Sequence, residues 1–174
     1  MSDESTFRYP QTGAEVEYVA DDPQAMAFVP DELITDLDTA ADLLIDLLEQ
    51  RLQAVIDTHP GPPGLMLSGG IDSILAAAVC ARIGIRPHAV TVVTDGGADQ
   101  PPDDLRGVDV ARHFDFSHDL LTLNPALITE AATRCIDKLG TWKVWEVTSA
   151  IPNRAAFDRF EALGTGPVFT GAGS

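Results

Sequence analysis

Apolar residues recur along this chain at two spacings, one typical of amphipathic helices and the other of buried strands. Between residues 31 and 58 they repeat every three or four positions with Asp and Glu on the other faces, which predicts a helix that ends before the Pro60-Gly61-Pro62-Pro63 segment. Short apolar or β-branched runs predict strands at residues 64–67, 88–94, 116–123 and 166–170. Helical patterns stand between these strands, at residues 74–83, 103–113, 125–139 and 149–163.

The alternation of strands and helices predicts an α/β fold, a doubly wound, mostly parallel sheet with helices on both faces. Ligands of such sheets bind beyond the carboxyl ends of the strands. Residues 7–19 alternate loosely on either side of Gln11-Thr12-Gly13, and we expect an arm or a hairpin within residues 1–30. The predicted organisation is therefore an N-terminal arm or hairpin at 1–30 and a single α/β domain at 31–174.

The chain is acidic, with a formal net charge of −16 and two lysines, Lys138 and Lys143. Binding of phosphate backbones requires clustered Lys and Arg, so the composition argues against a nucleic-acid partner. No apolar run approaches the roughly 20 residues of a membrane span. The N-terminus, Met1-Ser2-Asp3-Glu4, is acidic where a secretory signal is basic and then apolar. We expect a cytoplasmic protein without a membrane partner.

The segment Ser68-Gly69-Gly70-Ile71-Asp72-Ser73 joins a predicted buried strand to a predicted helix. A turn in this position directs backbone N–H groups from the positive end of the helix, which suits a polyphosphate. The glycines let the backbone come close, and the two serines add hydroxyl donors. A carboxylate at Asp72 beside bound phosphate is best explained as a Mg²⁺ ligand, directly or through water.

Other interpretations of this loop are weaker. It lacks the Gly-Lys-Ser/Thr ending of a Walker loop and the third glycine of the dinucleotide fingerprint. Ser-Gly-Gly alone is compatible with an ordinary tight turn in which Asp72 favours the helix dipole. The whole hexamer between a strand and a helix is more specific and favours phosphate binding.

The hexamer resembles the signature of the PP-loop ATP pyrophosphatases, which split ATP into AMP and pyrophosphate. Over residues 36–174 the chain further resembles the synthetase domain of asparagine synthetase in the order and spacing of its segments. These segments are the helix before the loop, Thr141-Trp142-Lys143-Val144-Trp145-Glu146-Val147 with Ser149-Ala150-Ile151-Pro152 after it, and Val168-Phe169-Thr170-Gly171-Ala172-Gly173-Ser174. The resemblance implies an adenine nucleotide α-hydrolase-like fold and a PP-loop ATP-binding synthetase domain at 31–174.

The resemblance also implies roles for individual residues. The ATP phosphates would be held by the end of the strand and by the loop, at Leu67, Ser68, Gly69, Gly70, Asp72 and Ser73. Val93 would lie near the adenine, and Gly171 would border the reacting acyl phosphate. Asp72 is the expected catalytic residue and metal ligand, so the expected cofactors are ATP and Mg²⁺.

Two departures from the family pattern limit what can be transferred. No Cys follows Met1, so glutamine hydrolysis is not expected from this chain. The family's closing motif has an acidic residue where Ala172 stands here, and it continues one residue past Ser174 to an Asp that binds Mg²⁺. We therefore expect a domain incomplete at its C-terminus, whose site is completed by a partner chain or a C-terminal region.

The leading hypothesis is an ATP-dependent carbon–nitrogen ligase of the asparagine synthase type, acting in amide synthesis and amino-acid biosynthesis. It would convert a small carboxylate into an acyl-AMP and pass the acyl group to an amine or ammonia, with release of AMP and pyrophosphate. One alternative is a non-catalytic nucleotide-binding subunit or half of a split enzyme, which Ala172 favours. Another is a sulfur-transfer or tRNA-modifying PP-loop enzyme, which requires a reactive cysteine and a basic surface.

Several other residues have plainer expectations. We expect Cys80 and Cys135 to be buried thiols. The tryptophans at 142 and 145 could line a substrate cleft, but we expect at least one of them in the core. A metal pair of His113 and His118 is conceivable, and packing or surface roles are favoured. We interpret residues 95–99 as a polar connecting loop rather than as part of the nucleotide site.

Overall fold

The computed structural model describes residues 6–8, 15–17, 34–95 and 105–171. Its central layer is a sheet of four strands in the order β5-β4-β3-β6, every neighbouring pair of which is parallel. The strands are β3 (Gly64–Met66), β4 (His88–Thr94), β5 (His118–Leu123) and β6 (Val168–Phe169). The helices are α2 (Leu37–Thr58), α3 (Ile71–Arg82), α4 (Arg106–His113), α5 (Pro125–Leu139) and α6 (Val144–Leu163). The predicted parallel α/β fold is confirmed.

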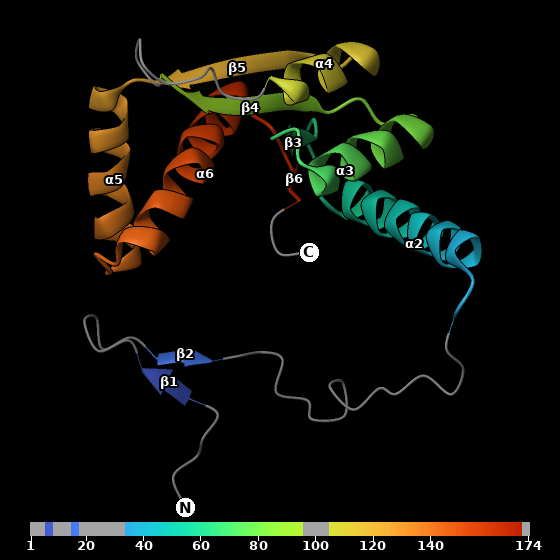
Figure 1. Cartoon of the computed structure of the whole chain (residues 1–174), viewed down its shortest axis with the longest axis horizontal. Helices are drawn as coiled ribbons and strands as arrows, with labels where there is room; N and C mark the ends of the chain where they lie inside the picture. Colours follow the sequence, from blue (N-terminus) through green and yellow to red (C-terminus); the bar gives the residue numbers. More distant parts are fainter. Residues whose placement is uncertain (1–5, 9–14, 18–33, 96–104, 172–174) are drawn as a thin grey trace, which may run out of the picture.

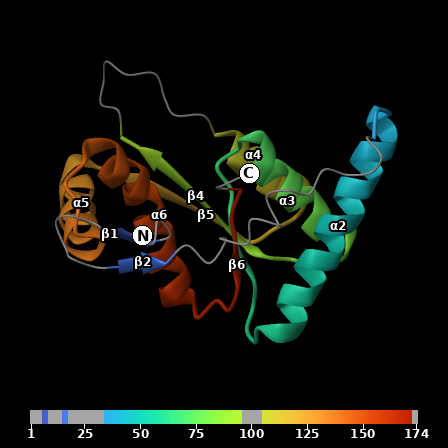
Figure 2. The same cartoon turned by 90° about the horizontal axis from the view of Figure 1, so that it is seen from below.

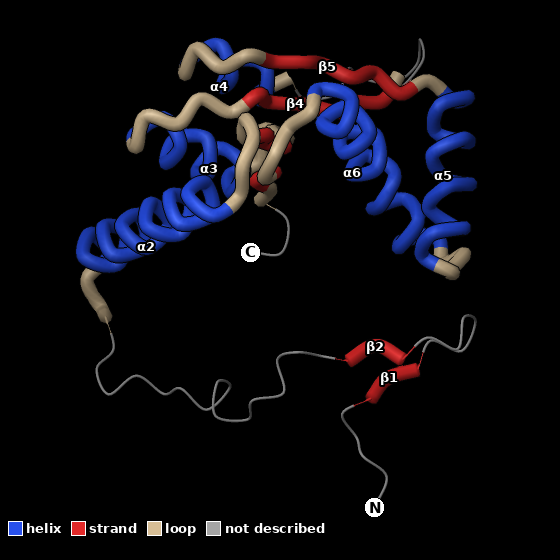
Figure 3. Tube along the Cα trace, turned by 180° about the vertical axis from the view of Figure 1, so that it is seen from behind, coloured by secondary structure: helices blue, strands red, loops and turns tan. Residues whose placement is uncertain are grey.

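Helices cover both faces of this sheet. Figures 1 and 2 show α5 and α6 on one side of the strands and α2 and α3 on the other, and Figure 3 shows the same division from behind. Successive residues of β4 pack against different helix layers, because the side chains of a strand alternate between the two faces of the sheet. Ala89 packs with residues of α3 and α4, whereas Val90 packs with Ala156 and Phe160 of α6.

Local sequence signals account for where α2 and α5 begin. Asp36 caps α2 by accepting a hydrogen bond from the Thr39 N–H at 2.8 Å. Asn124 caps α5 in the same way, with Pro125 in the first turn and Gly140 in the left-handed conformation at the end. The bounds of α5 and β4 are those predicted from the sequence.

Helix α6 is longer than predicted. It begins at Val144, five residues before the expected start at 149, and contains Pro152 in its interior. The proline removes one backbone donor from the helix, but tertiary packing offsets this cost, because Val147 and Ile151 are buried against α5.

A hairpin is present near the N-terminus. Strand β1 (Thr6–Arg8) pairs antiparallel with β2 (Glu15–Glu17), in line with the weak alternation in the sequence. Residues 18–33 lie outside the described residues, so the division of the chain at residue 30 stays a prediction. None of the described helices combines the length and the apolar character that crossing a membrane would require.

Candidate functional site

The loop between β3 and α3 has a backbone conformation that depends on Gly69. This residue has φ of +82°, in the left-handed region that favours glycine. Space excludes a side chain as well, because an added Cβ would lie 2.8 Å from the Gly107 nitrogen and 2.9 Å from the Arg106 Cβ. The loop is thus packed against the first turn of α4.

Hydroxyl groups fasten the loop to the first turn of α3. The Ser73 Oγ donates to the Gly70 carbonyl at 2.9 Å, and the Ser68 Oγ lies 3.1 Å from the Ser73 Oγ. Because the Ser73 hydrogen is used in the first bond, Ser68 is the donor in the second. The Ser68 Oγ also accepts from the Gly70 N–H at 3.2 Å. These hydrogen bonds hold the loop in a set shape.

The opening of α3 provides backbone donors for an anion. Gly70 is the N-cap residue, and the Ile74 N–H is the first to bond back along the helix, to the Gly70 carbonyl at 3.0 Å. The N–H groups of Ile71, Asp72 and Ser73 have no acceptor within the helix, as in every first helical turn. These donors and the positive end of the helix dipole suit a phosphate group.

Asp72 is exposed in the first turn of α3 and lies directly against the segment that follows β6. An added Cβ at Gly171 would stand 2.9 Å from the Asp72 Cβ and 2.8 Å from the Ser73 nitrogen. The fold thus brings Gly171 to the loop, and its role beside an acyl phosphate stays a prediction. Residues 172–174 and 96–99, on which other expectations depended, lie outside the described residues.

The remaining two expected site residues are Leu67, directly after β3, and Val93, near the end of β4. Leu67 is fully buried in the last position before the loop, and Val93 is half-buried near the carboxyl end of β4. Since β3 and β4 are parallel, the chain leaves both strands at the same end of the sheet. Contact of Val93 with adenine stays a prediction.

Sequence reasoning missed a group of residues beneath the loop. The Thr91 hydroxyl donates to the Leu67 carbonyl at 2.6 Å, and the His118 Nε2 lies 2.9 Å from the same hydroxyl oxygen. Gly107 packs over this contact. The available signal was a threonine between two valines in the middle of a predicted strand, because a buried hydroxyl requires a partner.

The charges around His118 have identifiable effects on its pKa. Burial lowers the pKa of His118, the nearby Asp119 opposes this shift, and His88 adds to it. The Arg159 guanidinium, 2.7 Å from the Asp119 carboxylate, lowers the pKa of Asp119, and a hydrogen bond from His88 at 2.9 Å acts in the same direction. At neutral pH, Asp119 is therefore an ionised carboxylate that ties β4 and β5 to α6.

The histidines do not pair as metal ligands. His118 bonds to Thr91, and the His113 ring packs edge-on against Phe114 with their centroids 4.8 Å apart. In the part of the chain that the structure describes, no three His, Cys, Asp or Glu side chains are grouped in a way that could hold a metal. Of the residues predicted for the loop site, Asp72 is the one with a carboxylate.

The expectation of a core tryptophan was wrong. Trp142 is 73% exposed and Trp145 is 68% exposed. Val147 and Ile151, one helical turn apart, occupy the face of α6 that packs on α5. Trp145 precedes Val147 by two positions, which places its side chain on the opposite side of the helix, away from that core.

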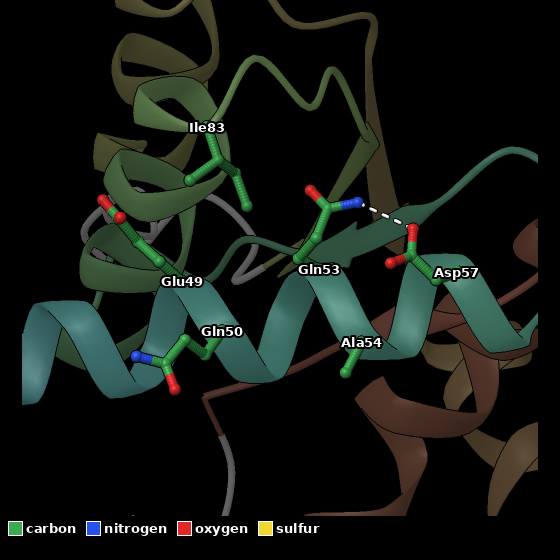
Figure 4. Close-up of a pocket in the computed structure, with 6 residues that line it drawn as sticks. All are labelled: Glu49, Gln50, Gln53, Ala54, Asp57 and Ile83. Carbon is green, nitrogen blue, oxygen red and sulfur yellow. Dashed lines mark hydrogen bonds between the residues drawn. The ribbon is translucent and has the colours of Figure 1, made fainter.

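The pocket drawn in Figure 4 is a different part of the molecule. It has a volume of about 460 Å³ and is lined by α2 residues and by Ile83, which caps the C-terminal end of α3. The loop stands at the other end of α3, about 18 Å away for a helix of 12 residues. The carboxylates that line the pocket have partners, since Asp57 accepts a hydrogen bond from Gln53 and Glu49 forms an ion pair with Arg82. This pocket is therefore not part of the candidate site.

Comparison with known families gives one match over most of the chain. A family model described as asparagine synthase matches residues 41–174. No protein with a curated description matches this sequence.

Solved structures of larger proteins resemble the chain in part. An NMN synthetase from Francisella tularensis is 17% identical with a TM-score of 0.47. The match covers 72% of this chain and 50% of the synthetase chain. An NH₃-dependent NAD synthetase from Campylobacter jejuni is 13% identical with a TM-score of 0.45, covering 74% and 54%. A glutamine-dependent NAD⁺ synthetase from Acinetobacter baumannii, in complex with ADP, is 18% identical with a TM-score of 0.49, covering 77% and 26%. The chain thus spans about half of the first two proteins and about a quarter of the third.

Proposed function

This chain belongs to the asparagine synthase family of the PP-loop ATP pyrophosphatase superfamily, and on that premise we propose that it activates a small carboxylate by adenylation. Membership of this family supports an activity of the ATP-dependent adenylating ligase type. The proposed finer activity is formation of an acyl-AMP and transfer of its acyl group to an amine or ammonia. The observation that supports it is the first turn of α3, whose N–H groups have no acceptor within the helix, beside a loop held by hydrogen bonds of Ser68 and Ser73.

The proposed reaction has two steps. A carboxylate oxygen attacks the α-phosphorus of ATP, the bond from that phosphorus to the bridging oxygen breaks, and pyrophosphate leaves with the bonding electrons. The amine nitrogen then attacks the acyl carbon, loses a proton, and AMP leaves. Negative charge grows on the pyrophosphate in the first step, and the N–H groups in the first turn of α3 would stabilise it.

The chemistry of Asp72 fits a Mg²⁺ site of the usual kind for nucleotides. Mg²⁺ keeps several waters and binds one or two carboxylates together with phosphate oxygens. Asp72 is exposed at the opening of α3, where its carboxylate is within the first turn that would face the phosphates. When bound there, Mg²⁺ would neutralise part of the charge of the leaving pyrophosphate.

The state of the cysteines argues against a sulfur-transfer activity. Such enzymes carry sulfur on an accessible, low-pKa thiol. Cys80 is fully buried, and burial raises the pKa of its thiol to about 11. Cys135 is 4% exposed, and burial raises the pKa of this thiol also. The sequence contains no other cysteine.

The test is release of AMP and pyrophosphate from MgATP, with aspartate as the first carboxylate and ammonia as the amine, by the natively expressed protein of recorded intact mass. We expect equal amounts of both products, and a loss of at least about a hundredfold in rate for Asp72→Asn. Asp38→Asn is the matched control, since Asp38 is an exposed acidic residue in the first turn of α2. Full AMP production by Asp72→Asn would refute the assignment of Asp72 to the catalytic site. Binding of MgATP without either product, across a panel of carboxylates, would favour the non-catalytic nucleotide-binding subunit.

A further inference from the structure

The hydroxyl of Thr91 lies beneath the start of the phosphate loop. Thr91 is 1% exposed in the middle of β4, and its Oγ1 donates to the Leu67 carbonyl at 2.6 Å. Leu67 is the last residue before the loop, and its N–H donates to the Val90 carbonyl at 2.9 Å. Both polar backbone groups of Leu67 are therefore held by β4, one by its backbone and the other by a side chain.

The direction of the second hydrogen bond follows from the first. The Thr91 hydroxyl has a single hydrogen, which is used in the bond to Leu67. The His118 Nε2, 2.9 Å from the same oxygen, must then carry the hydrogen and donate to Thr91. A directed chain of hydrogen bonds thus runs from β5 through β4 to the end of β3, and it fixes the ring tautomer of His118 with Nε2 protonated.

Helix α4 covers this chain of hydrogen bonds. An added Cβ at Gly107 would lie 2.4 Å from the Leu67 carbonyl oxygen and 2.6 Å from the Thr91 Oγ1. The Gly107 nitrogen also lies against Gly69, where an added Cβ would approach it to 2.8 Å. The same glycine therefore contacts both the loop and the bond beneath it, and its close approach keeps water away from that bond.

Fixing the Leu67 carbonyl has a direct consequence for the loop. The peptide unit between Leu67 and Ser68 is planar, and in a trans unit the carbonyl and the next N–H point in opposite directions. The Leu67 carbonyl points toward β4, where Thr91 holds it, so the Ser68 N–H points away from β4. We propose that Thr91 and His118 are positioning residues that aim the Ser68 N–H and hold the start of the loop ready for the phosphates of ATP. This inference rests on the proposed function, because it assigns the loop to ATP.

The experiment compares two pairs of variants. Thr91→Val keeps the shape and removes the hydroxyl, whereas Thr91→Ser restores it. His118→Leu removes the donor, whereas His118→Gln keeps an N–H donor at a similar reach. Thr122→Val on β5, an exposed threonine, is the control. Each protein is measured for MgATP affinity by calorimetry and for amide exchange at residues 68–71 by NMR without nucleotide.

We expect Thr91→Val and His118→Leu to weaken MgATP binding by about tenfold, the scale of one lost hydrogen bond, and to speed exchange of the loop amides. Thr91→Ser, His118→Gln and the control should behave as the parent. Parental affinity and parental loop exchange in both Thr91→Val and His118→Leu would overturn the inference. If Thr91→Val does not fold, the MgATP affinity and the loop amide exchange of His118→Leu decide the inference. A parent that binds no MgATP refutes the proposed function, and the exchange of loop amides then decides the positioning role by itself.

Discussion

Gly171 and Asp72 are in contact although they lie far apart in the sequence: an added Cβ at Gly171 would come within 2.9 Å of the Asp72 Cβ. Gly171 follows β6, and Asp72 lies in the first turn of α3. The contact exists because β6 pairs in parallel with β3, so the chain leaves both strands at the same edge of the sheet. The proposed ATP site is therefore built from two segments that must remain packed together.

Substituting Gly171 should weaken nucleotide binding. In Gly171→Ala the added Cβ would lie 2.8 Å from the Ser73 nitrogen, so the segment after β6 must move away from the loop. We expect MgATP affinity, measured by calorimetry, to fall by about tenfold. Gly166→Ala is the control, because its Cβ would meet the Pro60 carbonyl at 2.3 Å at the other end of β6. That variant should lose stability without losing affinity, and equal affinity losses in the two would refute the local explanation.

The two loop glycines should differ in their tolerance of a methyl group. Gly69→Ala places a side chain at φ of +82° and against Gly107, and we expect it to lower the free energy of unfolding by about 1–3 kcal/mol. Gly70 has φ of −73°, and an added Cβ would meet the Ser68 Oγ at 3.3 Å. Gly70→Ala should stay within about 1 kcal/mol of the parent. Urea denaturation measures both, and an equally large loss in Gly70→Ala contradicts the described backbone.

Stability should fall as the pH drops below the ordinary pKa of histidine, in part because of His118. Burial lowers the pKa of His118 from its ordinary value of 6.5. Below pH 6.5 the unfolded chain therefore binds a proton that the folded protein resists, and stability is lost as the pH falls through the folded pKa. Urea denaturation at a series of pH values should show a smaller loss for His118→Gln than for the parent. The same loss in both proteins would mean that His118 is not the group responsible.

The two thiols should be inert in the folded protein. Cys80 and Cys135 are buried, and burial raises the pKa of both, that of Cys80 to about 11. We expect no alkylation by iodoacetamide at pH 8 under native conditions and two alkylations in urea, read by intact mass. Rapid native alkylation of either residue would contradict its burial and would reopen the sulfur-transfer interpretation.

The sequence alone determined the class of fold and the location of the loop. Runs of β-branched residues and apolar residues spaced three or four apart depend on local geometry, so β4 and α5 were predicted with their observed bounds. The hexamer from Ser68 to Ser73 was recognisable because a tight turn that opens a helix needs small and polar residues at neighbouring positions. These features are encoded within a few residues of one another.

Only the tertiary structure decided which distant residues support the loop. Thr91, Gly107 and His118 come from three separate elements, and their hydrogen bonds and close approach to Leu67 arise from the strand order and from the packing of α4. The same holds for α6, whose early start and exposed Trp145 follow from the face that packs on α5. Contacts between segments depend on how the elements pack, and residue type and spacing along one chain do not record that information.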